Sequence, residues 1–275
     1  MAHTKQDRFS KLVDVKLRAT LVTKDGIIFN NRYEGDPKAG AVKIPVRDTE
    51  ATVADYTANT GANITEGTTT YKTLTIDKDK AVNELIDGYA AAAVPDNLAA
   101  DRLDSAGYAL AAQIDKDGIA CLEAKATNME SSSHTPLTEN TVYASFVDAR
   151  TKMSKANVPN DGRRWALVSP ETYALLLKCP EFIKASDLGD KIVQNGAVGQ
   201  VAGFNVFEAT RLAAKTEYIT GHPDWCCRVH EWQVPVHLQD LNSSGKFIGA
   251  SAVQGRKVYA HDVTKPATLF IKTNA

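Results

Sequence analysis

The sequence predicts an α+β fold, because helical and strand-like patterns occupy separate stretches and no strand–helix–strand alternation or internal repeat appears. Three observations support this prediction. Apolar residues alternate with polar or small ones at residues 42–46 and 71–76, as expected for strands. A helical spacing of apolar residues runs through residues 96–126. Strand-like runs then dominate residues 204–271.

Composition limits the classes of function. The 275 residues include 32 Lys and Arg against 33 Asp and Glu, a formal net charge of -1. A protein that grips nucleic-acid phosphates needs a basic stripe, and the longest basic run here is Arg163-Arg164. We therefore expect only weak, non-specific contact with DNA. The sequence has neither a signal-peptide pattern nor an apolar run of membrane-spanning length, so we expect cytosolic synthesis and no membrane partner.

The first eighty residues predict two projecting elements. The short apolar segment 12–22 is followed by Gly, Asn and Pro turns up to Gly40, which indicates an extended arm that needs its own body or a neighbour as a surface. The strands near 42–46 and 71–76 then enclose Arg47–Thr70, rich in Thr, Gly, Ala, Asp and Asn. We expect a long hairpin whose polar loop is an interaction element or a lid.

The middle of the chain predicts helices. Leu103, Leu110, Ile114 and Cys121 recur at spacings of seven, four and seven, which predicts one long helix that begins at Pro95-Asp96 and ends near residue 126. A linker at residues 127–138, which contains Ser131-Ser132-Ser133, precedes a second helix, and a strand at residues 165–168 precedes a third. The second helix has an apolar face formed by Tyr143, Phe146, Val147 and Met153.

The strongest candidate for metal chemistry is a cluster within sixteen residues: His222, Cys226, Cys227, His230 and His237. Thiolates and imidazoles are the ligands that zinc prefers. However, the spacing contains no C-x-x-C, and adjacent cysteines on a strand point to opposite faces. We interpret the cluster as structural and predict no metal site, with a metal-binding cytosolic enzyme as the less favoured alternative.

Other candidate sites favour structural roles. The stretch Gly196–Gly203 lacks the Gly-Lys-Ser/Thr ending of a phosphate loop. Ser169, followed by Pro170, is typical of a helix cap and lacks the Gly-x-Ser-x-Gly context of a nucleophile. Pairs of acids that adjoin lysines predict solvated faces: Asp77 with Asp79, and Asp115 with Asp117. We therefore predict no catalytic residue, no cofactor and no enzyme activity.

Several phrases along the chain resemble the tailed-phage major capsid proteins of the Hong Kong ninety-seven fold (HK97-like fold). The resemblance covers nearly the whole chain and depends on several short sequence segments spread along it. They are Arg32-Tyr33-Glu34-Gly35 with Val42-Lys43-Ile44-Pro45, Leu74-Thr75-Ile76-Asp77-Lys78 with Ile86-Asp87, Val168-Ser169-Pro170-Glu171 with Leu175-Leu176, Asn195-Gly196-Ala197-Val198-Gly199 with Ala202-Gly203-Phe204, and Val253-Gln254-Gly255-Arg256-Lys257-Val258.

This resemblance implies a division of the chain. Residues 1–40 would form an N-terminal arm and residues 41–80 an extended loop (E-loop). A peripheral domain with a long spine helix would contain residues 81–160 and 226–275. An axial domain would contain residues 161–225.

The resemblance also implies a function: a virion protein, made and assembled in the cytoplasm of the bacterial host, whose pentamers and hexamers close into an icosahedral shell around double-stranded phage DNA. Its partners would be other copies of itself, with scaffolding, portal and decoration proteins as further candidates. An encapsulin-type bacterial compartment shares the fold and is the alternative. Some members join a lysine of the extended loop to a neighbour's asparagine, but no pair can be matched here, so we predict no crosslink.

Overall fold

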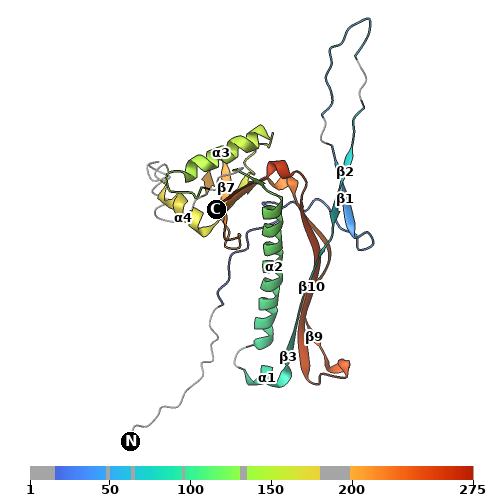
Figure 1. Cartoon of the computed structure of the whole chain (residues 1–275). Coiled ribbons are helices and arrows are strands. Elements are labelled where there is room, and N and C mark those ends of the chain that lie inside the picture. Colours follow the sequence, from blue (N-terminus) through green and yellow to red (C-terminus); the bar gives the residue numbers. More distant parts are fainter. Residues whose placement is uncertain are drawn as a thin grey trace.

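An elongated body built on two sheets carries a long hairpin that projects away from it (Figure 1). This is a computed structural model. It describes residues 16–47, 50–62, 66–94, 97–130, 135–179 and 199–274. The predicted helix start at Pro95-Asp96 lies outside the described residues, as do residues 131–134 of the predicted linker and residues 196–198 of the stretch Gly196–Gly203.

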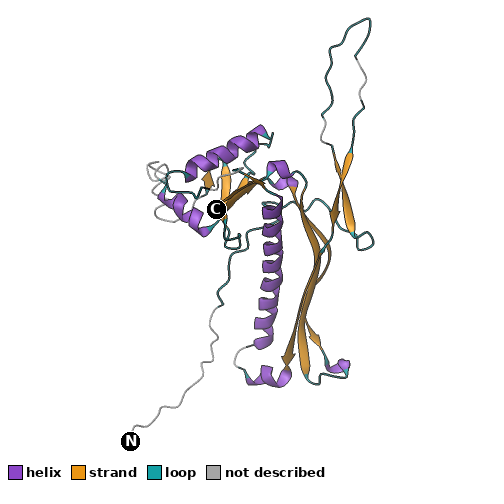
Figure 2. Ribbon diagram, in the orientation of Figure 1, coloured by secondary structure: helices purple, strands orange, loops and turns teal. Residues whose placement is uncertain are grey.

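The first sheet has three strands in the order β3-β10-β9, and both neighbouring pairs are antiparallel. The strands are β3 (Lys78–Asp87), β9 (Cys226–Asp240) and β10 (Ala250–Val263). The short helix α1 (Gly88–Ala93) follows β3, and the long helix α2 (Leu98–Lys125) runs along the sheet (Figure 2). The predicted long helix is therefore confirmed to within two residues at its start and one at its end.

Close packing of α2 on the sheet depends on a glycine. A side chain at Gly255 of β10 would place its Cβ 2.8 Å from Val236 Cγ2 and 3.1 Å from Leu110 Cδ1. Both separations are shorter than normal carbon contacts, so a larger residue at this position would force Val236 of β9 and Leu110 of α2 to shift. At the start of α2 the Asn97 side chain accepts a hydrogen bond from the amide of Ala100 at 3.2 Å, as a helix cap does.

The second sheet has six strands in the order β4-β11-β8-β5-β7-β6. Its strands are short, and β5 is buried along its whole length. The strands are β4 (Thr127–Asn128), β5 (Trp165–Val168), β6 (Gln200–Val201), β7 (Phe204–Glu208), β8 (Thr216–Gly221) and β11 (Phe270–Thr273). The described 3-10 helices are Pro223–Trp225, Asn242–Ser244 and Pro266–Thr268.

Both faces of the six-stranded sheet are covered, as the alternation along β5 requires. Ala166 and Val168 face a cluster with the helices α3 (Val142–Lys155) and α4 (Pro170–Lys178). Trp165 and Leu167 face the opposite cluster, which contains apolar residues from the end of α2, from the arm and from β11. The sheet is therefore the middle layer of the upper half of the body in Figure 2.

The predicted second and third helices are confirmed, with one correction in the second. Phe146 and Met153 are fully buried, but Val147 is 39% exposed because the buried face of α3 runs through Val142 and Ala149 instead. At the start of α4 the Ser169 side chain accepts from the amide of Thr172 at 3.2 Å, which confirms the predicted cap.

The grouping of elements differs from the expected division at residue 160. Helix α3 lies in the expected peripheral segment, yet Phe146 stacks on Tyr218 of β8 with ring centroids 4.5 Å apart. Strand β11 lies in the returning peripheral segment, yet it pairs with β4 and β8 of the six-stranded sheet. Strand β4, helix α3 and strand β11 therefore belong with β5 and β8 of the expected axial segment, because long-range pairing overrides sequence proximity.

Candidate assembly surfaces

The projecting hairpin has a short paired stem and a long exposed loop. Its strands β1 (Ala41–Val46) and β2 (Thr70–Thr75) pair antiparallel, which confirms the predicted hairpin. The described residues at 50–60 and 66–70 are all exposed, including Val53 at 95%. A segment with this composition can bury apolar surface only against another surface.

The body holds the hairpin at its root. Ile44 and Leu74 are each 2% exposed, and they pack with Cys227, Val229 and Ala260 of β9 and β10. This apolar cluster, here called the root cluster, joins the stem of the hairpin to β9 and β10. The root is therefore part of the subunit's own core, while the loop is not.

The described part of the arm, from residue 16 onward, packs on its own chain. The hydroxyl of Tyr108 on α2 donates to the carbonyl of Ala19 at 2.8 Å. The amides of Val22 and Thr23 donate to one carboxylate oxygen of Asp115, at 3.0 and 2.8 Å. Further along, Phe29 is fully buried in the cluster between α2 and the six-stranded sheet.

A buried charge network fixes this part of the arm. Asp115 pairs with Arg211 at 2.9 Å, and Arg228 donates to Asp25 at 2.9 Å. Arg228 also donates to His261 Nε2 at 2.9 Å. Burial and the charge of Arg228 lower the pKa of His261 to about 3, so its neutral ring can accept that hydrogen bond. His230 and Arg228 lie beside Asp25 and hold the pKa of that carboxyl below its usual value.

Comparison with known proteins identifies the family. A family model described as phage capsid protein matches residues 90–235, more than half of the chain. This chain belongs to the phage capsid protein family. No curated protein matches this phage capsid protein.

Solved structures share the fold of this phage capsid protein over nearly its whole length. A structure from Mycobacterium phage Che8 has a TM-score of 0.80 at 22% identity and covers 98% of each chain. The capsid of cyanophage P-SCSP1u has a TM-score of 0.82 at 13% identity, over 98% of this chain and 93% of that one. The capsid of an empty GTA particle has a TM-score of 0.67 at 15% identity, over 98% and 95%. The expected capsid fold is therefore confirmed.

In this phage capsid protein the structure separates the cysteines and histidines that the sequence brings close. Cys226 packs in the cluster between α2 and the six-stranded sheet, whereas Cys227 packs in the root cluster. His222 Nε2 lies 3.1 Å from Asp161, and His237 Nδ1 lies 3.0 Å from the carbonyl of Pro235. Within the described part of the chain, no three His, Cys, Asp or Glu side chains are grouped so that they could hold a metal ion.

The acid pairs have different environments, and one prediction about them was wrong. Asp77 and Asp79 are exposed and pair with Lys78 and Arg256. Asp115 was expected on a solvated face, but it is 2% exposed and anchors the arm. The sequence did indicate this burial, because Asp115 lies between Ile114 and Ile119 on the apolar face of the predicted helix, and both are buried in α2.

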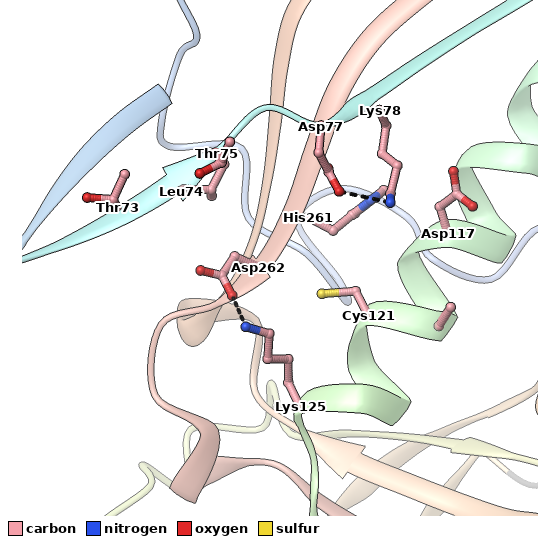
Figure 3. Close-up of a pocket in the computed structure, with 11 residues that line it drawn as sticks. Thr73, Leu74, Thr75, Asp77, Lys78, Asp117, Cys121, Lys125, His261 and Asp262 are labelled. Atoms are coloured by element: carbon pink, nitrogen blue, oxygen red, sulfur yellow. Dashed lines mark ion pairs between the residues drawn. The ribbon is translucent and has the colours of Figure 1, made fainter. Parts of the chain in front are cut away.

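A hollow of about 470 Å³ lies beside the hairpin root, between β2, β10 and the last turns of α2 (Figure 3). The charges on its wall are paired: Asp77 lies 2.9 Å from Lys78, and Asp262 lies 3.4 Å from Lys125. Burial raises the pKa of the Cys121 thiol on the same wall to about 11, so the thiol stays protonated at neutral pH. Among the described residues, no helix is long and apolar enough to cross a membrane.

Proposed function

We propose that this chain is the major capsid protein of a tailed phage, whose copies form pentamers and hexamers that close into an icosahedral shell around double-stranded DNA. The observation that carries the proposal is a body of capsid fold with a projecting hairpin whose described loop residues are exposed. When a projection on one side of a subunit meets a different surface on the next copy, the contact generates a closed ring if the rotation between copies closes, and an open filament if it does not.

The structural neighbours support this assembly because they are capsid structures. One is the capsid of a cyanophage, another is the asymmetric unit of the mature capsid of bacteriophage PhiM1, and a third is the capsid of a GTA particle computed with C5 symmetry. The match to the phage capsid family favours a container for DNA over an encapsulin-type compartment.

The proposed role is structural and not catalytic. A near-neutral charge of -1 suits a wall that lines DNA with weak, non-specific contacts. In this role the protein is made and assembled in the cytoplasm of the bacterial host and resides in the virion capsid. Scaffolding, portal and decoration proteins are the partners that such a shell would use.

Expression of the chain, alone and together with the scaffolding protein of the same phage, tests the proposal. Light scattering after size-exclusion chromatography should show particles of megadalton mass, and electron microscopy should show closed shells with fivefold and sixfold capsomers. A strictly monomeric profile across a range of salt and protein concentrations, with the scaffold present, would contradict the proposal.

A further inference from the structure

Lys72 of the hairpin strand β2 is held by the end of β10. Its ammonium lies 3.3 Å from Asp262 Oδ2, donates to the carbonyl of Val263 and lies 3.5 Å from the carbonyl of Thr264. An ammonium has three donors, so these three acceptors can satisfy it completely. The side chain is only 28% exposed, which shields the interaction from water and salt.

The carboxylate of Asp262 also forms an ion pair with a lysine of helix α2. Lys125, in the last turn of α2, lies 3.4 Å from Asp262 Oδ1 (Figure 3). The amide of Val263 donates to that oxygen at 2.7 Å. The Asp262 side chain is 10% exposed, so its charge is largely removed from water and depends on these partners. The carboxylate of Asp262 therefore links strand β2 of the hairpin, strand β10 of the three-stranded sheet and helix α2.

A second attachment of the root is apolar, with Tyr33, Val42, Val46 and Ile76 packed around the buried residues of the root cluster. Ile44 and Leu74 pack on the sheet in the root cluster. Apolar contacts are not directional, so this cluster sets the position of the stem better than its angle. The hollow of about 470 Å³ leaves space beside the root into which the stem could rock. A directional contact on that side is needed to fix the angle.

We propose that Asp262 is a positioning residue, which sets the angle at which the hairpin leaves the body by holding Lys72 and Lys125 on one carboxylate. The proposal rests on the function proposed above, because the angle decides where the loop meets the next copy. Without the carboxylate, Lys72 loses its charged partner and the stem rocks about the root cluster. The loop then reaches its neighbour in many orientations, and fewer of them allow a regular ring.

The angle can be measured without assembly, by distances between fluorophores in unassembled subunits. Non-natural amino acids would carry the fluorophores at Ala58 in the loop and at Lys116 on α2, both exposed positions. Asp262→Asn keeps the shape of the side chain and removes its charge. Asp117→Asn is the matched control, because Asp117 lines the same hollow but its carboxylate accepts from Tyr259 at 2.8 Å.

We expect a narrow distance distribution in the parent and the control, and a broadened one in Asp262→Asn. Lys72→Met should broaden the distance distribution in the same way. If Asp262→Asn does not fold, the distribution of Lys72→Met tests the proposal instead. The double variant should be no broader than Asp262→Asn alone, because the ion pair between Lys72 and Asp262 is already lost in that variant. A folded Asp262→Asn or Lys72→Met chain with the parent's distribution would overturn the proposal.

Particle yield is a separate readout. In the parent's assembly conditions, Asp262→Asn should reduce the yield of regular particles by about tenfold, the effect of losing one ordinary contact from an equilibrium. If the parent forms no particles, the proposed function fails while the distance measurement still tests Asp262. If Asp262→Asn rocks freely and still assembles at the parent's yield, the angle does not matter for assembly and the positioning role is wrong.

Discussion

Asp115 of α2 and Arg211, which follows β7, form an ion pair of 2.9 Å, and the same carboxylate accepts the main-chain amides of Val22 and Thr23. The Asp115 side chain is 2% exposed, and that of Arg211 is 19% exposed. The arm is therefore attached to helix α2 by a buried charge whose partners come from two other parts of the chain, the arm and the segment after β7.

Replacing Asp115 with Ala should destabilise the subunit strongly. The change leaves Arg211 without its anion and two buried amides without an acceptor, and such losses cost about 3–5 kcal/mol in the free energy of unfolding. Urea denaturation of the unassembled chain measures this. Asp104→Ala is the control, since it breaks only an exposed pair with Arg18 and should leave stability unchanged. Equal effects of the two substitutions would contradict the assignment.

The buried carboxyl of Glu217 should make stability depend on pH. Glu217 is 7% exposed, and burial raises the pKa of its carboxyl above the ordinary value of 4.5. A raised pKa means that its contribution to stability is present below pH 4.5 and is lost as the pH rises through the raised value. Glu217→Gln removes this loss and keeps an oxygen to accept from the amide of Leu137, which lies 2.8 Å from Oε1.

We therefore expect Glu217→Gln to be more stable than the parent at pH 7.5, and the difference to shrink as the pH falls toward 4.5. Thermal unfolding of both chains at several pH values measures the effect. A variant that is less stable than the parent at pH 7.5, or a difference that grows on acidification, would show that the carboxylate is stabilised in the fold.

Cys226 and Cys227 should act as apolar core residues. Each Cys→Ser substitution places a hydroxyl in an apolar cluster, which should lower the free energy of unfolding by about 1–3 kcal/mol. Burial raises the pKa of the Cys227 thiol to about 11, so alkylation at pH 8 should be slow until the chain unfolds. Chelators should leave the melting temperature unchanged. One tightly bound zinc per chain, lost together with the fold in Cys226→Ser, would overturn this interpretation.

The hairpin loop should matter for assembly and not for the fold of its own subunit. Replacing residues 50–67 with a short Gly-Ser turn should spare the far-ultraviolet circular dichroism spectrum and the melting temperature, because the described loop residues are almost all exposed. Particle yield should fall to near zero, since each subunit loses part of an interface of the size that holds proteins together. Gly107→Ala on α2 is the control, because it lies outside the loop and an added Cβ there meets no atom within 4 Å.

Two outcomes would contradict the assignment of the loop. Normal particles from the shortened chain would show that the loop makes no essential contact between copies. A shortened chain that no longer folds would place the loop in its own subunit's core.

Local signals explain which parts of the fold could be predicted. The long helix and the hairpin follow from the spacing of apolar residues such as Leu110 and Ile114, and from the alternation around Ile44. The cap at Ser169 depends on an amide only three residues away. Each of these signals lies within one element, so the sequence contains it in full.

The buried charges and the grouping of elements could not be predicted in the same way. Asp115 is buried by partners 92 and 96 residues away, at Thr23 and Arg211, and no local pattern reports such distant pairing. Asp115 and Asp117 look alike in sequence, yet one anchors the arm and the other accepts from Tyr259. The pairing of β11 with β4 is likewise long-range, which is why the expected boundary at residue 160 did not match the observed cores.

One cluster of apolar side chains contains Phe29 from the arm, Ile119 and Leu122 from the spine helix, Trp165 from β5 and Ile271 from β11. None of these elements can leave the cluster without exposing the others to water. Heating should therefore melt the arm, the helix and the six-stranded sheet in a single endothermic transition, with equal van't Hoff and calorimetric enthalpies for that step. If the body unfolds in one step, no partly unfolded subunit is populated during heating, and each subunit enters an assembly fully folded.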